Sequence, residues 1–351
     1  MQHSAAESEA NRADARRLAE AINAYQLSAA IGALARLGVA DAVAAEPLHP
    51  DEIAKRVGAD TGALGRLLEA THDLGLFSVD VDGRYGLTRA GELLRADARG
   101  SLRRLAIVST DEWRWRAYGH LTHAVRTGEP GFVPAHGCSF WDYLESHPEA
   151  AASFQESMAR ISALRDAAFV RSYDVGALHR IVDVGGGDGS LLCAWLGAHP
   201  DARGLLFDRS NAIEVARKKI AAAELADRCE LVAGDFFDSV PEGGDAYVLS
   251  WILHDWSDEK AHAILSNCRG AMGETARLLV IELVVPARDE ASAADVTRMV
   301  RQTDLEMLGV VGGRERTAAE LSQLLAQAGF RLDRIVPLVG TPWSVLDAAP
   351  T

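Results

Sequence analysis

The sequence is poor in the features that mark secreted, zinc-binding and membrane proteins. Its 351 residues include only four cysteines, which are widely separated and form no C-x-x-C pair. This spacing argues against a zinc site or a disulfide framework, and it favours core thiols in a reducing compartment. No apolar run approaches the length that crosses a bilayer, and the polar amino terminus lacks the apolar segment of a signal peptide. We therefore expect a soluble, cytoplasmic protein.

Basic residues are also few relative to acidic ones. Lys and Arg number 36 against 50 Asp and Glu, which gives a formal net charge of −14 at pH 7. An acidic surface repels phosphate groups, so nucleic acids and anionic membranes are not expected as partners. The chain is long enough for two domains and a sizeable core.

The first hundred residues are predicted to form a small, mainly helical domain. Apolar periodicity and capping signals predict helices over residues 16–45, 50–58 and 63–76, the first breaking at Gly38 and the last capped by Thr61. Residues 77–88 alternate around Asp82-Gly83, which is a strong signal for a hairpin. Helices followed by a hairpin in this order predict a winged helix.

A winged helix raises the hypothesis of DNA binding. The segment that would enter a DNA groove, residues 63–77, carries Glu69 and Asp73 beside a single Arg, and the hairpin adds Asp80 and Asp82. Such a surface repels phosphates. The first helices have more apolar positions than one buried face needs, which instead favours the interface of a homodimer.

Residues 102–173 are predicted to be helical and are rich in aromatic residues. Three glycines and two prolines between Gly128 and Gly137 predict an irregular break. Aromatic residues at helical spacing usually belong to a core, but a flat apolar ligand would also need such walls. The candidate wall residues are Phe140, Trp141, Phe154 and Met158.

The second half is organised around residues 180–191, which predict a strand, a tight turn and a helix. Gly185, Gly187 and Gly189 allow positive φ angles and let backbone N–H groups approach a ligand at the start of the helix. The next apolar strand ends in Asp208, where a ribose-binding carboxylate belongs. A glycine-rich turn without a ligand is the alternative interpretation.

Strands and helices then alternate, which predicts the α/β class with a Rossmann-like, doubly wound and mostly parallel sheet. Ligands of such sheets bind beyond the carboxyl ends of the strands. Strands are predicted over residues 180–184, 204–207, 229–233, 246–249 and 277–283, with an edge hairpin over 331–338 and 343–348. Helices are predicted over residues 191–198, 211–223, 258–272 and 318–328.

Acidic and aromatic residues dominate the carboxyl ends of these strands. A cationic nucleoside without phosphate would be favoured by acids, and S-adenosylmethionine is such a ligand. Its sulfonium is positively charged, and its ribose and adenine suit carboxylate and aromatic partners. The residues concerned are Asp208, Arg209, Asp235, Phe236, Phe237, Ser250, His254, Glu282 and Glu315.

Four motifs resemble, in order and spacing, the small-molecule O-methyltransferases of the plant caffeate and bacterial polyketide or phenazine type. These motifs are Asp183–Ser190, Gly234–Phe237, Leu253–Asp258 and Gly312–Thr317. The resemblance extends over nearly the whole chain. It implies a winged-helix dimerisation domain over residues 1–100 and, over 101–351, a helical acceptor-binding segment followed by the catalytic domain. It also implies S-adenosylmethionine as methyl donor without a metal, and an aromatic acceptor.

The resemblance further implies a role for each matching residue. It implies a general base, His254, flanked by the carboxylates of Glu282 and Glu315. The cofactor would contact Gly185, Gly187, Asp208, Arg209, Asp235, Phe236, Phe237 and, through its backbone, Ser250. The acceptor pocket would include Phe154, Met158 and Met307, with Trp141 as a further wall. Plant relatives carry Lys at the position of Ser250, so no lysine side chain acts there.

The chemistry of methyl transfer gives an independent reason for a histidine. A neutral phenol, with a pKa of about 10, is a poor nucleophile, and a histidine with a pKa near 6.5 can accept its proton. The resulting imidazolium needs a carboxylate to orient it. Asp255 is expected to point away from His254 and to be structural, whereas Ser257, Asp258 and Thr317 are expected to cap helices.

Two other functions stay open on the sequence alone. A relative that binds S-adenosylmethionine could catalyse hydroxylation or decarboxylation instead, although His254 and both glutamates argue against this. A winged-helix regulator that responds to S-adenosylmethionine is disfavoured by the acidic segment described above. The identity of the acceptor lies beyond the sequence.

Overall fold

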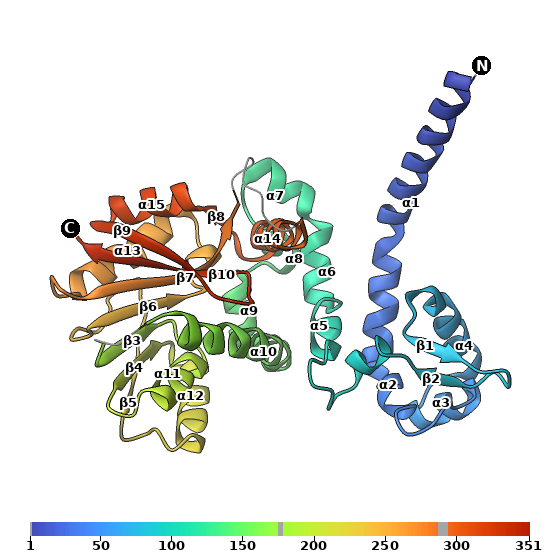
Figure 1. Ribbon diagram of the computed structural model, residues 1–351, viewed down its shortest axis with the longest axis horizontal. Coiled ribbons are helices and arrows are strands. Elements are labelled where there is room, and N and C mark those ends of the chain that lie inside the picture. Colours follow the sequence, from blue (N-terminus) through green and yellow to red (C-terminus); the bar gives the residue numbers. More distant parts are fainter. Residues whose placement is uncertain (1, 175–177, 287–293) are drawn as a thin grey trace. The chain divides into compact units, whose positions relative to one another are not determined.

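The computed structural model describes residues 2–174, 178–286 and 294–351. They form two compact units (Figure 1). The first unit comprises Met1–Trp115 with Ala152–Ser157, and the second comprises Arg116–Ala151 with Met158–Thr351. No helix of this described part is long and apolar enough to span a membrane.

The first unit contains the predicted series of helices followed by a hairpin. Its elements are α1 (Gln2–Leu37), α2 (Val39–Ala42), α3 (Pro50–Val57), α4 (Thr61–Ala70), η1 (His72–Leu74), β1 (Phe77–Val79), β2 (Tyr85–Leu87), η2 (Gly91–Leu94) and α5 (Arg103–Val108). The antiparallel pairing of β1 with β2 confirms the predicted hairpin. Buried apolar residues from α1 to β2, among them Leu34, Ile53, Leu68 and Phe77, form the core of this unit.

Two details of the first unit differ from the prediction. Helix α1 begins at Gln2 rather than near Arg16, because residues 2–15 are mostly Ala, Glu and Arg, which are strong helix formers. The cap of α4 is Asp60 rather than Thr61. The Asp60 carboxylate accepts the Ala63 N–H at 2.8 Å, and this leaves Thr61 as the first helical residue.

The second unit is built on an eight-stranded sheet with the order β5-β4-β3-β6-β7-β10-β9, and β8 pairs with β7 outside this path. The first five strands in this order are parallel, and β10 and β9 are antiparallel. The strands are β3 (Arg180–Val184), β4 (Arg203–Asp208), β5 (Cys229–Ala233), β6 (Ala246–Ser250), β7 (Arg277–Val285), β8 (Arg316–Thr317), β9 (Phe330–Pro337) and β10 (Trp343–Pro350).

Helices cover both faces of this sheet, as the α/β prediction requires (Figure 1). The helices in and leading to the second unit are α6 (Glu112–Gly119), α7 (Leu121–Thr127), α8 (Phe132–His136), α9 (Phe140–Ser146), α10 (Pro148–Ser172), α11 (Ser190–Ala198), α12 (Ser210–Ala222), η3 (Leu253–Asp255), α13 (Asp258–Ala271), α14 (Ala294–Glu306), the π-helical turn η4 (Met307–Val311) and α15 (Ala318–Gln327).

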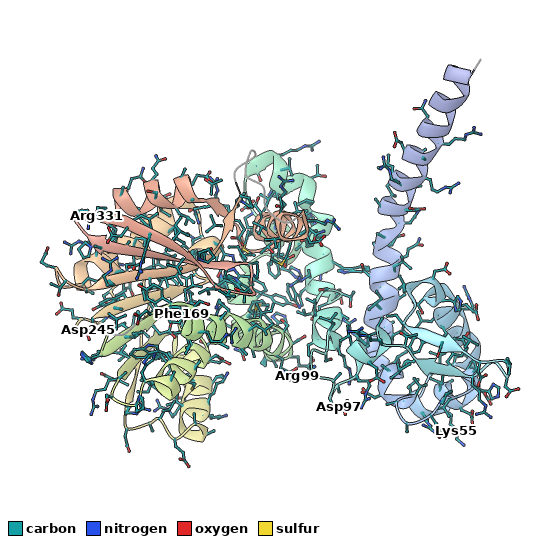
Figure 2. All side chains as sticks on the ribbon, viewed as in Figure 1. Lys55, Asp97, Arg99, Phe169, Asp245 and Arg331 are labelled. Carbon is teal, nitrogen blue, oxygen red and sulfur yellow. The ribbon has the colours of Figure 1, made fainter. Side chains whose placement is uncertain are left out.

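Alternate residues of each strand enter different cores. On β3, Ile181 packs with α10 and α11, where Phe169 and Trp195 are fully buried (Figure 2). Its neighbour Val182 packs on the opposite face with α13 and α15. This period of two is the geometry of a strand that is buried on both faces. The sheet is therefore covered by an apolar core on each of its two faces.

The first helix leaves apolar side chains exposed in the single chain. Leu18 and Ile22 are each 64% exposed, and Tyr25 is 58% exposed. Their spacing of three and four residues places them on one side of α1. Exposed apolar residues grouped in this way mark an interaction surface.

We expect the double substitution Leu18→Glu and Ile22→Glu to weaken self-association, because two charges would be buried at a subunit interface. Light scattering after size-exclusion chromatography would measure the oligomeric state. The matched control is Val125→Glu, which places a charge at another exposed apolar residue. Unchanged mass for the double variant would contradict an interface on α1. A deletion of the whole helix is a poorer test, because it also removes Leu34 from the core.

Candidate active site

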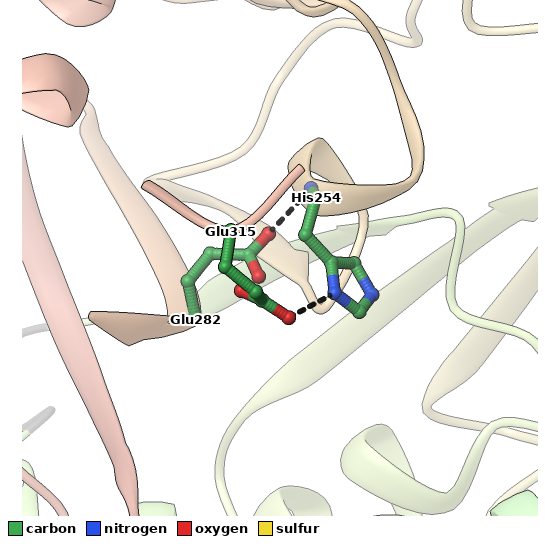
Figure 3. Close-up of side chains that lie close together, drawn as sticks. All are labelled: His254, Glu282 and Glu315. Carbon is green, nitrogen blue, oxygen red and sulfur yellow. Dashed lines mark hydrogen bonds and ion pairs between the residues drawn. The ribbon is translucent and has the colours of Figure 1, made fainter. Parts of the chain in front are cut away.

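A buried histidine lies just beyond the carboxyl end of β6. His254 belongs to η3, and its Nδ1 lies 2.8 Å from Oε1 of Glu315 (Figure 3). Its Nε2 lies 3.4 Å from Oδ1 of Asp255. The prediction that Asp255 points away from His254 is therefore wrong, because the tight η3 turn brings this carboxylate back to the imidazole. The two nitrogens of the ring face two different carboxylates.

Glu282 contacts the backbone of the turn rather than the imidazole ring. This residue lies on β7, and its Oε1 accepts the backbone N–H groups of Leu253 at 2.9 Å and His254 at 3.3 Å. His254, Glu282 and Glu315 nevertheless form one cluster, since a nitrogen or oxygen from each lies within 4.8 Å of the others. The structure thus brings together all three residues predicted to be catalytic, with Glu282 in a supporting position.

The carboxyl groups of this cluster are shielded from water. Burial raises the pKa of Glu315 to about 8, with a further increase from the nearby Asp304. Burial also raises the pKa of Glu282 and of Asp255, each to about 7. The second carboxylate oxygens of Glu282 and Glu315 have no hydrogen-bond partner among the described residues. Groups with such pKa values exchange protons near neutral pH, as acid–base chemistry requires.

A loop from a distant part of the chain holds the turn that carries His254. The buried guanidinium of Arg316 donates from Nη1 to the Leu253 carbonyl and from Nη2 to the Trp256 carbonyl, each at 2.8 Å. Its Nε donates to Oδ1 of Asp258 at 2.9 Å. The sequence prediction missed this role of Arg316, although the residue lies within the last of the four motifs.

Gly313 makes this close approach of the two segments achievable. A Cβ atom at Gly313 would lie 1.9 Å from the carbonyl oxygen of His254, so no other residue fits. The next residue, Arg314, donates its backbone N–H to that carbonyl at 2.8 Å. Two of the three predicted caps, Ser257 and Thr317, are confirmed in the same region, whereas Asp258 is the first residue of α13 and its carboxylate accepts from Arg316. Ser257 accepts the Lys260 N–H, and Thr317 forms a capping box with Glu320.

The glycine-rich turn after β3 has the backbone that the sequence predicts. Gly185 and Gly187 have φ angles of 73° and 57°. The Gly187 N–H donates to Oδ2 of Asp208 at 2.8 Å, and the Arg209 N–H donates to Oδ1 of the same carboxylate at 2.6 Å. A Cβ atom at Gly185 would lie 2.6 Å from the Ile252 side chain. Burial nevertheless raises the pKa of Asp208, because few water molecules reach it.

A second acid, Asp183, lies beneath this turn. Neither of its carboxylate oxygens has a hydrogen-bond partner within the described residues. Burial, followed by repulsion from Asp166, raises the pKa of Asp183 to about 8. Asp166 on α10 accepts from Arg165 at 3.1 Å, and its own pKa is raised to about 6 by burial. Two buried acids beside one arginine can accommodate a further positive charge.

A pocket of about 560 Å³ opens beside the ends of β4 and β5, and it is lined by Glu145, Arg209, Ser210, Asn211, Ala233 and Gly234. Arg209 pairs with Glu145 at 2.8 Å and lies 3.9 Å from Asp235. Asp235 accepts the Phe237 N–H at 2.8 Å. Arg209 therefore lines this pocket, and its ion pairs connect it to Asp235, the next predicted cofactor residue.

Aromatic rings join the predicted cofactor residues to the predicted acceptor wall. Trp256 meets Phe237 edge-on at 4.9 Å and Phe236 at 6.1 Å. Trp141 on α9 stacks on the same Trp256 at 6.5 Å. These rings form one aromatic cluster, and Trp256 joins its two parts.

The remaining predicted residues are placed as follows. Met307 begins η4, is buried, and belongs to a turn that packs against η3. Met158 is half-buried on α10 in the second unit, whereas Phe154 belongs to the first unit. Ser250 ends β6, and its buried hydroxyl has no hydrogen-bond partner within the described ranges. The roles of Phe154 and Met158 stay predictions.

The chain is similar to known methyltransferases along most of its length. Residues 118–331 match the model of an O-methyltransferase domain, and residues 19–97 match an O-methyltransferase dimerisation domain. The chain is 38% identical over 333 residues to phenazine O-methyltransferase PhzM of Lysobacter antibioticus, which covers 95% of each chain. It is 33% identical to phenazine-1-carboxylate N-methyltransferase of Pseudomonas aeruginosa, over 93% of this chain and 95% of that protein.

A solved structure is similar over nearly its whole length. The O-methyltransferase NcsB1 from neocarzinostatin biosynthesis, in complex with S-adenosylmethionine and 2-hydroxy-5-methyl naphthoic acid, has a TM-score of 0.82 and 37% identity. The match covers 93% of this chain and 96% of that one.

The buried Asp183 predicts a stability that depends on pH. Its pKa of about 8 in the folded protein lies above the ordinary value of 3.8, so the folded state retains a proton that the unfolded chain releases. The contribution of Asp183 is complete below about pH 4 and is lost as the pH rises through about 8. Between about pH 5 and pH 8, Asp183→Asn without cofactor should therefore lose less thermal stability than the wild type. Calorimetry would measure this slope, and the exposed Asp201→Asn should keep the wild-type slope. Equal slopes for all three proteins would contradict the shifted pKa.

Proposed function

Because the chain belongs to the S-adenosylmethionine-dependent O-methyltransferase family, we propose that it methylates a hydroxyl group of an aromatic small molecule. The observation that carries the proposal is the buried pair of His254 Nδ1 and Glu315, 2.8 Å apart at the carboxyl edge of the sheet. This pair leaves Nε2 of His254 as the nitrogen that can accept a proton. Relatives named for phenazine and naphthoate acceptors support a flat aromatic substrate from secondary metabolism.

The residues at the strand ends fit S-adenosylmethionine. The two unpartnered oxygens of Asp183 suit the ammonium group of its methionine, and the glycine turn over Asp183 has the positive φ angles that present bare backbone to a ligand. Asp208 suits the ribose hydroxyls, and the pocket beside Arg209 and Asp235 suits the adenine. When bound, the cofactor supplies a methyl group activated by a cationic sulfonium. The cluster of buried acids favours that charge.

In the proposed mechanism, Nε2 of His254 would accept the proton of the acceptor hydroxyl, whose oxygen would take the methyl group as the S–C bond of the sulfonium breaks and S-adenosylhomocysteine leaves. Glu315 holds Nδ1 and stabilises the imidazolium that forms. Glu282 accepts the backbone N–H groups of Leu253 and His254, so it positions the turn without a hydrogen bond to the imidazole ring. After the transfer, Oδ1 of Asp255, 3.4 Å from Nε2, can accept a hydrogen bond from the protonated Nε2. The aromatic rings of Trp141 and Trp256 would hold the acceptor, which contributes proximity to the rate.

Nitrogen is the alternative acceptor atom, since two relatives are named as N-methyltransferases. An aromatic amine attacks with its lone pair and releases its proton afterwards, so it depends less on a base. The His254–Glu315 pair favours a hydroxyl acceptor for this reason. The enzyme is proposed to act as a homodimer through the first unit, in agreement with its match to a dimerisation domain and the exposed apolar side of α1.

We expect His254→Ala to reduce turnover by roughly 10²–10⁴ and to leave the affinity for S-adenosylhomocysteine unchanged, because the base contacts the acceptor alone. Mass spectrometry of hydroxynaphthoates, hydroxyphenazines and hydroxybenzoates would measure the added methyl group. The exposed His179→Ala is the matched control.

Glu315→Gln and Glu282→Gln should each reduce turnover by less than His254→Ala does. The double variant should raise the activation free energy by less than the sum of the two separate increases, because both residues support one imidazole. A His254→Ala variant that keeps most of its rate on a hydroxyl acceptor would contradict the proposed base.

A separate expectation concerns the cofactor. Asp208→Ala should weaken the binding of S-adenosylhomocysteine by roughly 1.5–3 kcal/mol for each charge-assisted hydrogen bond lost. Titration calorimetry would measure this difference, with the exposed Asp201→Ala as control. Wild-type affinity in Asp208→Ala would remove Asp208 from the site.

A further inference from the structure

Trp251 has an unusual backbone at the point where β6 ends and the turn of His254 begins. Its φ angle is 61°, and Glu224 is the only other non-glycine residue of the described chain with a positive φ. A bulky side chain rarely adopts this left-handed conformation, which persists only where the surrounding structure imposes it. The Trp251 N–H still donates to the Ile281 carbonyl at 2.8 Å, so the residue remains bound to β7.

This conformation accompanies a stacked contact with the candidate base. The indole of Trp251 and the imidazole of His254 have ring centroids 5.0 Å apart and an angle of 17° between their planes. Trp343 of β10 contacts the indole edge-on at 5.6 Å, with an angle of 85°. The indole is therefore supported from the sheet, while it lies against the histidine ring.

We propose that Trp251 is a positioning residue for the base. Its aromatic face holds the imidazole so that Nδ1 stays on Glu315, and it stabilises the imidazolium that proton transfer creates. The physical reason is that the face of an indole attracts a cation much more strongly than it attracts a neutral ring. This inference rests on the proposed role of His254.

The charged groups around the two rings are consistent with this role. Glu315, Glu282 and Asp255 surround the imidazole. The guanidinium carbon of Arg165 lies 5.8 Å from the centre of the indole, but its charge is offset by Asp166 at 3.1 Å. Beyond Glu315 lie Arg316 and Asp304, of opposite charge. The indole therefore faces His254 without a competing unpaired cation.

A role in packing alone would need only an apolar side chain of similar size. The substitutions Trp251→Phe, Trp251→Leu and Trp251→Met separate the two roles, because Phe keeps an aromatic face and Leu and Met do not. Thermal unfolding and S-adenosylhomocysteine binding would identify which variants fold. If Trp251→Leu does not fold, Trp251→Met takes its place as the variant without an aromatic face.

The first measurement is a pH titration of ¹³C-labelled histidine by NMR in the S-adenosylhomocysteine complex, with the His254 signal assigned by its loss in His254→Ala. A cation held by an indole should titrate at higher pH. The titration midpoint should therefore fall by about 0.5–1 pH unit in the Leu or Met variant and stay near the wild-type value in Trp251→Phe. An unchanged midpoint in Leu and Met would overturn the inference.

The second measurement uses the rate of methylation of a hydroxynaphthoate. Trp251→Leu should lower kcat by roughly 10-fold or more, with little change in KM for S-adenosylmethionine. The acid limb of its curve of kcat against pH should move to lower pH. In a His254→Ala background the same substitution should have no further effect. If His254→Ala keeps its rate, the proposed base fails. If His254→Ala loses its rate but the effect of Trp251→Leu is additive to it, the inference about Trp251 alone fails.

Discussion

The candidate site depends on the close contact between two loops that lie about sixty residues apart in the chain, at His254 and at Glu315. One guanidinium, that of Arg316, binds two carbonyl oxygens on either side of His254. The absence of a side chain at Gly313 lets the backbones meet. Because Glu315 lies between Gly313 and Arg316, these contacts also fix Glu315 against His254, and both loops set the orientation of the imidazole. Geometry of this kind depends on support from residues beyond the pair itself.

The protein keeps several acids in surroundings that disfavour their charge. Asp183 and the second oxygens of Glu282 and Glu315 lack hydrogen-bond partners among the described residues, although buried polar groups are normally satisfied. Such groups reduce the stability of the folded chain, and they persist where function compensates. A cationic cofactor and an imidazolium would each neutralise one part of this acidic edge. Binding of the cofactor would therefore relieve repulsion as well as add contacts.

Much of the fold was predictable because it follows from short-range signals. The alternation of strands and helices and the glycine turn after β3 indicated the doubly wound sheet, and the strand ends indicated the residues that we propose for cofactor binding. Features that depend on a local backbone angle or on a distant segment were not predictable. The direction of the Asp255 side chain depends on the η3 turn. The stacking of Trp251 depends on a left-handed φ angle at a residue that is not glycine, so the sequence gives no sign of it. The contact of Glu282 with the backbone rather than with the ring depends on the register of β7 against β6.

The π-helical turn η4, which begins with Met307, packs against the η3 turn that carries His254. A π turn accommodates one more residue than an α turn, so it is equivalent to an α-helix that has received an insertion of one residue. Deleting one residue there would let the turn close with α geometry while α14 keeps nearly the same facing, because the wider turn absorbs the extra residue. A change of one residue in chain length at η4, and not only a substitution, would therefore alter the turn that packs against η3.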